Sequence, residues 1–274
     1  MKCFTLFQYW NQALKAVLFI YNLFLLLLLN YSQFLLIIIN NFTCMNKYSI
    51  RSFIEETAQD ESKNDFFQLE SVHMLELNIN NQTVMLKKGA MVAYTGNIKF
   101  EREGMLSKGI GNLLKKTMSG EGTTMMRTSG TGRVYAADFE KRVRILYLEN
   151  EAINVNGNDI LAHENSIQSD VKMMKSIAGI MGGGLFQVRL AGTGHIAITT
   201  HGKPMTLLVK PGQPIFTDPN ATVAWSGNLT PTIKTDISLK TFIGRGSGES
   251  FQMMFEGEGW VIVQPCEEVY GAPQ

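Results

Sequence analysis

The chain has 274 residues, enough for one domain with a substantial apolar core; 45% of them are hydrophobic, 18% are charged, and the formal net charge is +1. A charge so close to zero excludes a whole-molecule field that would draw the protein to nucleic acid or to an anionic membrane. The three cysteines, Cys3, Cys44 and Cys266, lie far apart in the sequence, which argues against a disulfide framework or a thiolate metal site.

Residues 1–44 form a hydrophobic N-terminal segment. The stretch from Ala16 to Ile39 carries no charge and is long enough to cross a bilayer as a transmembrane helix at about residues 16–39. The alternative is an over-extended start, because the segment lacks helical periodicity and a normal-looking start follows at Met45. Residues 45–65 are expected to form a short linker or helix.

A glycine pattern occurs three times in the rest of the chain. Its copies are Gly130-Thr131-Gly132, Gly192-Thr193-Gly194 and Gly257-Glu258-Gly259, at nearly constant spacing, each between two β-rich runs and each preceded by another glycine cluster. Glycine reaches positive φ without the steric penalty of a Cβ, so a G-x-G between two such runs predicts a tight chain reversal. The pattern therefore predicts three β-hairpins.

A second element recurs once before each glycine pair. Leu86 to Tyr94 resembles Val209 to Phe216, and Leu148 to Val155 takes the corresponding place in the middle copy. A Lys-x-Gly turn is expected to introduce a strand each time. Short strands with closely spaced turns predict an all-β fold, either a repeated-hairpin β-sandwich or a double-stranded β-helix-like domain, over residues 66–265, with a tail over 266–274.

Two amphipathic stretches interrupt the β pattern, each just before a glycine pair. The first, Met105 to Met118, has apolar residues at helical spacing and lysines on the other face; the second, Val171 to Met181, has a looser spacing. Both predict short helices, weakened by internal glycines, that dock a partner protein or a membrane surface. The residues expected to form this docking surface are Leu106, Lys108, Ile110, Leu113, Leu114, Lys115, Lys116, Met174, Ile177 and Met181.

No familiar catalytic, cofactor or metal-binding pattern accompanies the repeat. None of the triplets extends to G-x-G-x-x-G, and each lies between two predicted strands, which argues against dinucleotide binding. The four histidines, His73, His163, His195 and His201, lack the spacing of metal ligands. The chain is therefore expected not to be an enzyme and to bind no cofactor and no metal.

Positive charge is concentrated between Lys87 and Arg144, where basic residues outnumber acidic ones twelve to five. Such a stretch is typical of a surface for phosphate-bearing partners. We expect instead that these groups pair, within the fold or between subunits, with acidic residues of the C-terminal part such as Glu256 and Glu258. Basic and aromatic residues do not alternate as they do in proteins that bind single strands, so nucleic acid is not the expected partner.

Several stretches resemble one protein family. Phe66 to Glu70, Gly89 to Glu101, Asp218 to Trp225 and the glycine pairs at 130–132 and 257–259 are similar to the bacterial branch of the altered-inheritance-of-mitochondria protein 24 family. The resemblance implies a β domain like that of the tryptophan RNA-binding attenuation protein (TRAP-like) and no established enzymatic activity. Mitochondrial members are linked to inner-membrane organisation. Likeness of fold carries over neither a ligand nor RNA, because sites are grafted onto folds.

The leading functional hypothesis is a non-enzymatic scaffold or interaction protein. Three similar units with exposed strand edges favour a homo-oligomer, and a membrane surface or membrane protein is the other expected partner. The β domain is expected to be cytoplasmic, and membrane-anchored where residues 1–44 are translated. Two alternatives stay open: a nucleic-acid-binding module that uses residues 87–144, and a small-molecule-binding β-barrel that uses His195 and His201.

Overall fold

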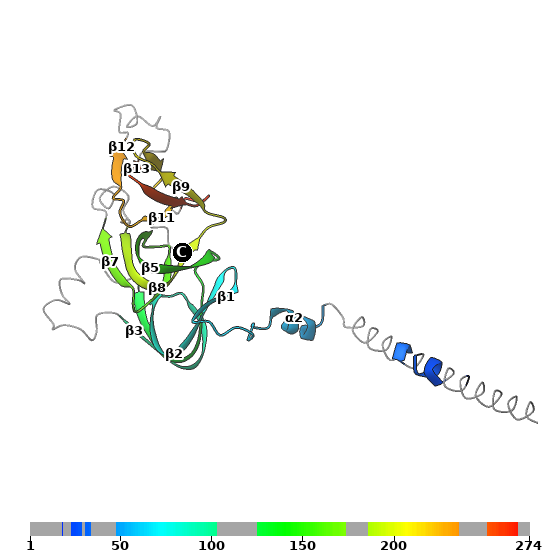
Figure 1. The fold of residues 1–274 in the computed structure, drawn as a ribbon. Coiled ribbons are helices and arrows are strands. Elements are labelled where there is room, and N and C mark those ends of the chain that lie inside the picture. The colour runs from blue at the N-terminus through cyan, green and yellow to red at the C-terminus, as the bar shows by residue number, and fades with distance from the viewer. Residues whose placement is uncertain are drawn as a thin grey trace, which may run out of the picture. The chain divides into compact units, whose positions relative to one another are not determined.

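The computed structural model describes residues 18, 23–28, 31–33, 48–102, 125–173, 186–235 and 251–267 of the chain. The chain divides into two compact units, residues 1–59 and residues 60–274. The described part of the first unit is mostly helical, and the second unit is built from β-strands (Figure 1).

The N-terminal hydrophobic segment is helical at residues 18, 23–28 and 31–33. Most of the predicted membrane span, residues 16–39, lies outside the described residues. Within the described ranges, no helix has both the length and the apolar character needed to cross a bilayer.

The linker before the β unit contains one short helix, α2 (Ile50–Thr57). Ser49 is its N-cap, and the Ser49 Oγ accepts a hydrogen bond from the Ser52 N–H at 3.1 Å, which satisfies one of the free N–H groups of the first turn. Arg51 and Glu55, one turn apart, form an exposed ion pair at 2.9 Å.

The second unit is mostly β, as the sequence predicts. Its described strands form an antiparallel sheet of eleven strands, in the order β3-β4-β2-β6-β8-β5-β11-β14-β9 with β1 beside β2 and β7 beside β8, and a three-stranded sheet in the order β10-β13-β12. The strands are β1 (Phe67–Ser71), β2 (Met74–Lys87), β3 (Met91–Arg102), β4 (Met125–Ala136), β5 (Arg142–Asn156), β6 (Ile160–Glu164), β7 (Gln168–Met173), β8 (Phe186–Thr200), β9 (Met205–Val209), β10 (Ile215–Thr217), β11 (Thr222–Ser226), β12 (Thr232–Thr235), β13 (Phe251–Phe255) and β14 (Gly259–Val263).

The sequence repeat is also a structural repeat. Each copy consists, in chain order, of a first strand, a second strand and a strand that carries the glycine pair. In the sheet, the glycine-bearing strand lies between the other two. Repeat 1 (residues 74–136) uses β2, β3 and β4; repeat 2 (residues 142–200) uses β5, then β6 and β7 in succession, then β8. In repeat 3 (residues 205–263) all three strands are split, into β9 and β10, β11 and β12, and β13 and β14.

The glycine pairs do not form the hairpin turns that the sequence predicts. The pair of repeat 1 lies in the middle of β4 and that of repeat 2 in the middle of β8, and these glycines have φ between 132° and 152°. Opposite them the first strands carry an extra residue at positive φ, Asn81 in β2 and Asn150 in β5. In repeat 3 the pair separates β13 from β14, which belong to different sheets. In repeats 1 and 2 the glycines and bulges therefore bend one long strand within the large sheet, and in repeat 3 the chain passes at this point from the small sheet to the large one.

The predicted Lys-x-Gly turns are confirmed in the outer copies only. Gly89, at φ 84°, lies between β2 and β3, and Gly212, at φ 73°, lies between β9 and β10. In the middle copy the corresponding residues, Glu149 to Glu151, form the bulge inside β5. The turn of that copy comes later, at residues 157–159. The sequence prediction for the middle copy is therefore wrong, because a bulge and a turn use the same positive-φ residue types.

Candidate interaction site

One stretch of β5 has no strand on its outer side. In repeat 1, β1 pairs with residues 74–77 of β2. The repeats align on the second glycine of each pair, which lies opposite Ile79 in β2 and opposite Leu148 in β5. Residues 143–146 of β5 therefore correspond to the part of β2 that β1 covers. No described strand pairs with them on the side away from β8.

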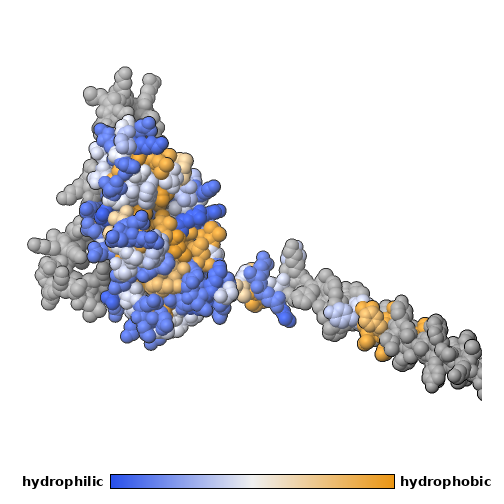
Figure 2. Space-filling model, viewed as in Figure 1, coloured by the Kyte–Doolittle hydropathy of each residue, from blue (hydrophilic) through white to orange (hydrophobic). Residues whose placement is uncertain are grey.

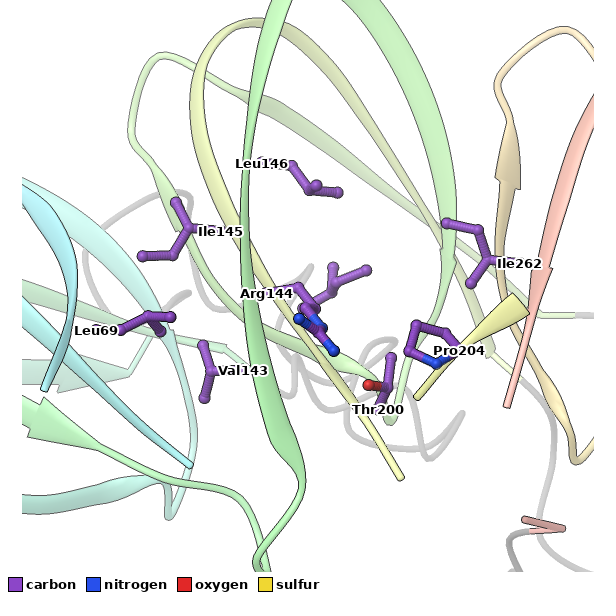
Figure 3. Close-up of a pocket in the computed structure, with 9 residues that line it drawn as sticks. Leu69, Val143, Arg144, Ile145, Leu146, Thr200, Pro204 and Ile262 are labelled. Atoms are coloured by element: carbon purple, nitrogen blue, oxygen red, sulfur yellow. The ribbon is translucent and has the colours of Figure 1, made fainter. Parts of the chain in front are cut away.

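An apolar cavity of about 360 Å³ lies along this open edge, and it is called the β5 cavity below (Figure 3). The Val143 N–H points out of the sheet edge, since it donates to the Val72 carbonyl oxygen at 2.9 Å; the Ile145 N–H, two residues on, faces the same side. Hydrophobic surface gathers over the middle of the second unit, where Figure 1 places β5 (Figure 2). The lining residues are Leu69, Val143, Arg144, Ile145, Leu146, Ile198, Thr200, Pro204 and Ile262.

The β5 cavity contains one charged side chain, Arg144 (Figure 3). Its Nε is buried and has no hydrogen-bond partner among the described residues. An unsatisfied buried donor costs about 1–3 kcal/mol, so a carboxylate or carbonyl oxygen that reached Arg144 would be stabilised there. The edge and the cavity together suit an extended, mostly apolar segment with an acceptor opposite this guanidinium.

A buried ionic cluster lies elsewhere, at the junction of repeats 1 and 2. The Lys87 Nζ lies 2.8 Å from the Asp138 Oδ2, and the Lys141 Nζ lies 3.0 Å from the Asp159 Oδ1. The Thr199 hydroxyl donates to the Asp138 Oδ2 at 3.1 Å. These groups come from the end of β2, the β4–β5 link, the β5–β6 turn and β8. Because each buried charge faces an opposite one, the cluster holds these elements together rather than offering a free reactive group.

Part of the basic stretch is engaged inside the fold. Lys87 and Lys141 belong to this cluster, and the Arg133 Nη1 lies 3.2 Å from the Oε1 of the buried Glu76. The acidic partners are Glu76 of repeat 1, Asp159 of repeat 2 and Asp138 of the link between them. For these three cations, the prediction that the partners come from the C-terminal part is therefore wrong. Three of the cations on which the nucleic-acid alternative depends are therefore already paired with carboxylates.

The small-molecule alternative relies on His195 and His201, which the structure does not bring together. They lie six residues apart along β8 and the turn after it, a separation of about 20 Å for extended chain. His195 instead contacts Glu164: its backbone N–H donates to the Glu164 Oε1 at 2.8 Å, and its Nδ1 lies 2.5 Å from the same oxygen. No group of three metal-ligating side chains occurs among the described residues.

The contact between His195 and Glu164 recurs in repeat 3. There the Trp260 N–H donates to the Ser226 Oγ at 3.1 Å, and Trp260 and Ser226 occupy the same repeat positions as His195 and Glu164. In both repeats a side chain of the second strand satisfies the N–H that follows the glycine pair. The recurrence indicates a structural role for Glu164 in binding the bent strand.

His163 gives the protein a pH-dependent stability. Burial holds the pKa of its imidazole below the ordinary 6.5, although the hydrogen bond to the Glu164 carbonyl oxygen opposes part of this shift. The unfolded chain therefore binds this proton at a higher pH than the folded chain does. The stability contributed by neutral His163 is complete above about pH 6.5 and is lost as the pH falls through the lower folded pKa.

We expect the His163→Phe variant to lose less free energy of unfolding than the wild type between pH 7 and pH 5, by about 1.4 kcal/mol for each unit by which burial lowers the pKa. Urea unfolding at a series of pH values measures the difference. Parallel pH profiles for the two proteins would contradict the assignment.

The ten residues predicted as a docking surface lie outside the described residues. Leu106 to Lys116 fall between β3 and β4, and Met174 to Met181 fall between β7 and β8. Both segments thus join a second strand to the glycine-bearing strand of the same repeat. The start of the second predicted helix is wrong, because Val171 to Met173 belong to β7 and pair with β8. The strand pairing prevails there over the loose helical spacing.

Sequence reasoning missed Arg144 and the rest of the β5 cavity. Its walls come from β1, from repeat 2 and from repeat 3, so no local motif marks it. One signal was present: residues 66–73 precede repeat 1 and include β1, whereas only residues 137–141 separate repeat 1 from repeat 2. A five-residue link is too short to add an equivalent strand beside β5 and still connect β4 to β5.

Known proteins resemble this chain over the β unit. The model of the family described as Mitochondrial biogenesis AIM24 matches residues 67–266. The crystal structure of protein SPYM3_0169 from Streptococcus pyogenes matches with a TM-score of 0.59 at 23% sequence identity, covering 73% of this chain and 92% of that one. At this identity the likeness concerns the fold alone. No curated protein matches the chain.

Proposed function

We propose, from the premise that this chain belongs to the mitochondrial biogenesis AIM24 family, that it is a non-enzymatic scaffold that binds other polypeptides along open strand edges. The same proposal takes the β domain as a TRAP-like sandwich of three units. The bends at the glycine pairs and the division of strands between two sheets support that architecture.

The observation that carries the proposal is the open edge of β5. Repeat 1 shows, within the same chain, how an extended segment covers this position: β1 adds to β2 and directs Phe67 into the apolar core. The equivalent stretch of β5 has no described strand on its outer side and lies beside an apolar cavity; its backbone contact there is the hydrogen bond from the Val143 N–H to the Val72 carbonyl oxygen. Strand addition gives affinity through main-chain hydrogen bonds and specificity through pockets for alternate side chains.

We expect Leu146→Arg to reduce the recovery of bound partners at least tenfold, because a charged side chain enters the β5 cavity; a tenfold loss corresponds to about 1.4 kcal/mol. Phe139→Arg is the matched control, since Phe139 is exposed and lies outside the cavity. Quantitative mass spectrometry of proteins retained by the full-length chain from its host measures the effect, and thermal unfolding checks that both variants fold. Equal recovery with both variants would rule out the cavity as the binding site.

Attachment to a membrane surface is a second candidate, favoured by α2. Ile50, Phe53 and Ile54 lie on one face of this helix at i, i+3 and i+4, and all three are exposed. A short amphipathic helix next to a hydrophobic segment suits the interface of a bilayer. Flotation of the full-length chain with anionic vesicles tests it, and a chain that stays at the bottom of the gradient would exclude it.

A further inference from the structure

A three-residue pattern marks the second strand of every repeat. It reads Val92-Ala93-Tyr94 in β3, Leu161-Ala162-His163 in β6 and Val223-Ala224-Trp225 in β11. The strand pairing makes these positions equivalent: Tyr94, His163 and Trp225 each lie opposite the residue two places after the second glycine, namely Val134, Ile196 and Val261.

In repeats 2 and 3 this pattern pairs with the preceding repeat. His163 of β6 lies opposite Met85 of β2, and Trp225 of β11 lies opposite Asn154 of β5. These two pairings between successive repeats are called joins below. Both joins use the same part of a first strand, just beyond its bulge, and the same antiparallel register. His163 and Trp225 are each only 2% exposed as a result.

Each join also completes an apolar core. Leu161 and Ala162 of repeat 2 pack into the core that is otherwise mainly that of repeat 1. Val223 and Ala224 of repeat 3 likewise pack into the core of repeat 2. The first two residues of the pattern thus fill the repeat before them, and this burial stabilises the stack of repeats.

Repeat 1 has no repeat before it, and its pattern is exposed. Val92 is 57% exposed and Tyr94 48%, although their counterparts are buried. At the other end of the stack, the first strand of repeat 3 is split into β9 and β10, and β10 is the part that follows the turn at Gly212. Phe216 in β10 is 50% exposed. Among the described strands, β3 ends the large sheet and β10 ends the small one. Figure 1 shows β3 and the small sheet at opposite ends of the second unit.

We propose that β10 of one copy pairs with β3 of a second copy of this chain, repeating between molecules the join that occurs twice within one. Alignment of the joins fixes the register: Ile215 opposite Thr95, Phe216 opposite Tyr94 and Thr217 opposite Ala93. Val92 and Ala93 then enter the core of repeat 3, as Val223 and Ala224 enter that of repeat 2.

A second copy fits this edge because the chain already contains both halves of the join. The contact brings two half-exposed aromatic rings, Tyr94 and Phe216, together as a cross-strand pair. It uses different surfaces on the two molecules, so it is a head-to-tail contact that builds a ring or a filament. The inference rests on the proposed function, since it names the chain itself as one partner of the scaffold.

Cysteine cross-linking tests the register, in full-length chains whose three native cysteines are replaced by serine. One chain carries Tyr94→Cys and the other Phe216→Cys. We expect mild oxidation of the mixture to form disulfide-linked dimers at least tenfold faster than either chain alone, because directly opposed Cβ atoms on antiparallel strands lie within reach of a disulfide. A mixture of Phe139→Cys and Phe216→Cys chains is the matched control. The proposal is wrong if the test mixture reacts no faster than this control, or if the Tyr94→Cys chain alone reacts as fast.

Sedimentation velocity of the full-length wild type and of Val92→Lys provides the second measurement. The wild type is expected to sediment as an oligomer and Val92→Lys as a monomer with unchanged thermal unfolding, because this exposed side chain is not part of the core of its own copy. A monomeric wild type overturns the head-to-tail join. If the wild type is monomeric but Leu146→Arg still reduces the recovery of partners, the head-to-tail join is wrong and the proposed function is supported. The two failures are therefore distinguishable.

Discussion

Replacing Gly132 with alanine is expected to lower the free energy of unfolding by about 4 kcal/mol. Gly132 has φ 152° in the middle of β4, and a Cβ built on it would overlap the carbonyl oxygen of Thr95 in β3. Backbone atoms cannot move aside as a flexible side chain can, so the strain of the unfavourable φ and the overlap both act on the folded state. Guanidinium chloride unfolding, followed by circular dichroism, measures the loss.

Two further glycines make the prediction specific. Gly212→Ala is the matched control: its φ is 73°, but an added Cβ meets nothing within 4 Å, so only the left-handed backbone penalty of about 1–2 kcal/mol remains. Gly194→Ala should fall between the two, because its Cβ would meet the side chains of Ser166 and Glu164 rather than backbone. Similar losses for Gly132→Ala and Gly212→Ala would show that φ alone, and not the close approach of β3, requires glycine in β4.

The glycine pairs also show how far the sequence predicts this fold. Their recurrence correctly indicates three equivalent units, and all of these glycines except Gly259 have positive φ. The reversal inferred from them is wrong because strand bends and hairpin turns both recruit glycine. A local signal for the difference was present: Thr131 and Thr193 between the glycines are β-branched, which suits a continuing strand better than a turn.

Which strand edges stay open depends on contacts between repeats, and the sequence pattern does not predict these contacts. Val92, Leu161 and Val223 look alike in the sequence, yet only Val92 is exposed. The difference arises because burial depends on whether another repeat precedes the strand, a property of the whole stack rather than of the segment. The same holds for the β5 cavity, which Leu69 and Ile262 line together although they lie near opposite ends of the β unit in the sequence. Helical spacing predicts the docking residues between Leu106 and Lys116 and between Met174 and Met181, and both groups lie outside the described residues.

The pattern of three repeats leaves open strand edges at the ends and sides of the stack, which is where the proposed function would act. Internal joins bury the second strands of repeats 2 and 3. Among the described strands, the open edges with apolar side chains beside them then include β3, β10, the outer side of β5, and β9, where Met205 and Leu208 are exposed. Open apolar edges are a risk of aggregation unless a partner covers them. A protein that keeps them is therefore suited to assembly, either with itself or with an extended segment of another chain.

We expect Asp138→Ala to destabilise the protein by about 3–5 kcal/mol, a large part of the stability of a typical domain. Asp138 is 3% exposed; its Oδ2 pairs with the Lys87 Nζ and accepts from the Thr199 hydroxyl. Truncation leaves the half-buried ammonium of Lys87 without this carboxylate and removes the link between β2 and β8. The cost comes mainly from the uncompensated charge, because a well-made buried ion pair is by itself close to neutral in free energy.

Asp170→Ala is the matched control for that effect. Asp170 pairs with Lys172 at 3.7 Å, but both side chains are more than half exposed, and exposed pairs contribute about 0–1 kcal/mol. Urea unfolding of the two variants should therefore differ by at least about 2 kcal/mol. A double variant, Asp138→Leu with Lys87→Met, should recover much of the loss, since it removes the orphaned charge as well as the pair. If Asp138→Ala and Asp170→Ala proved equally mild, the junction of repeats 1 and 2 would have to be held by its apolar core alone.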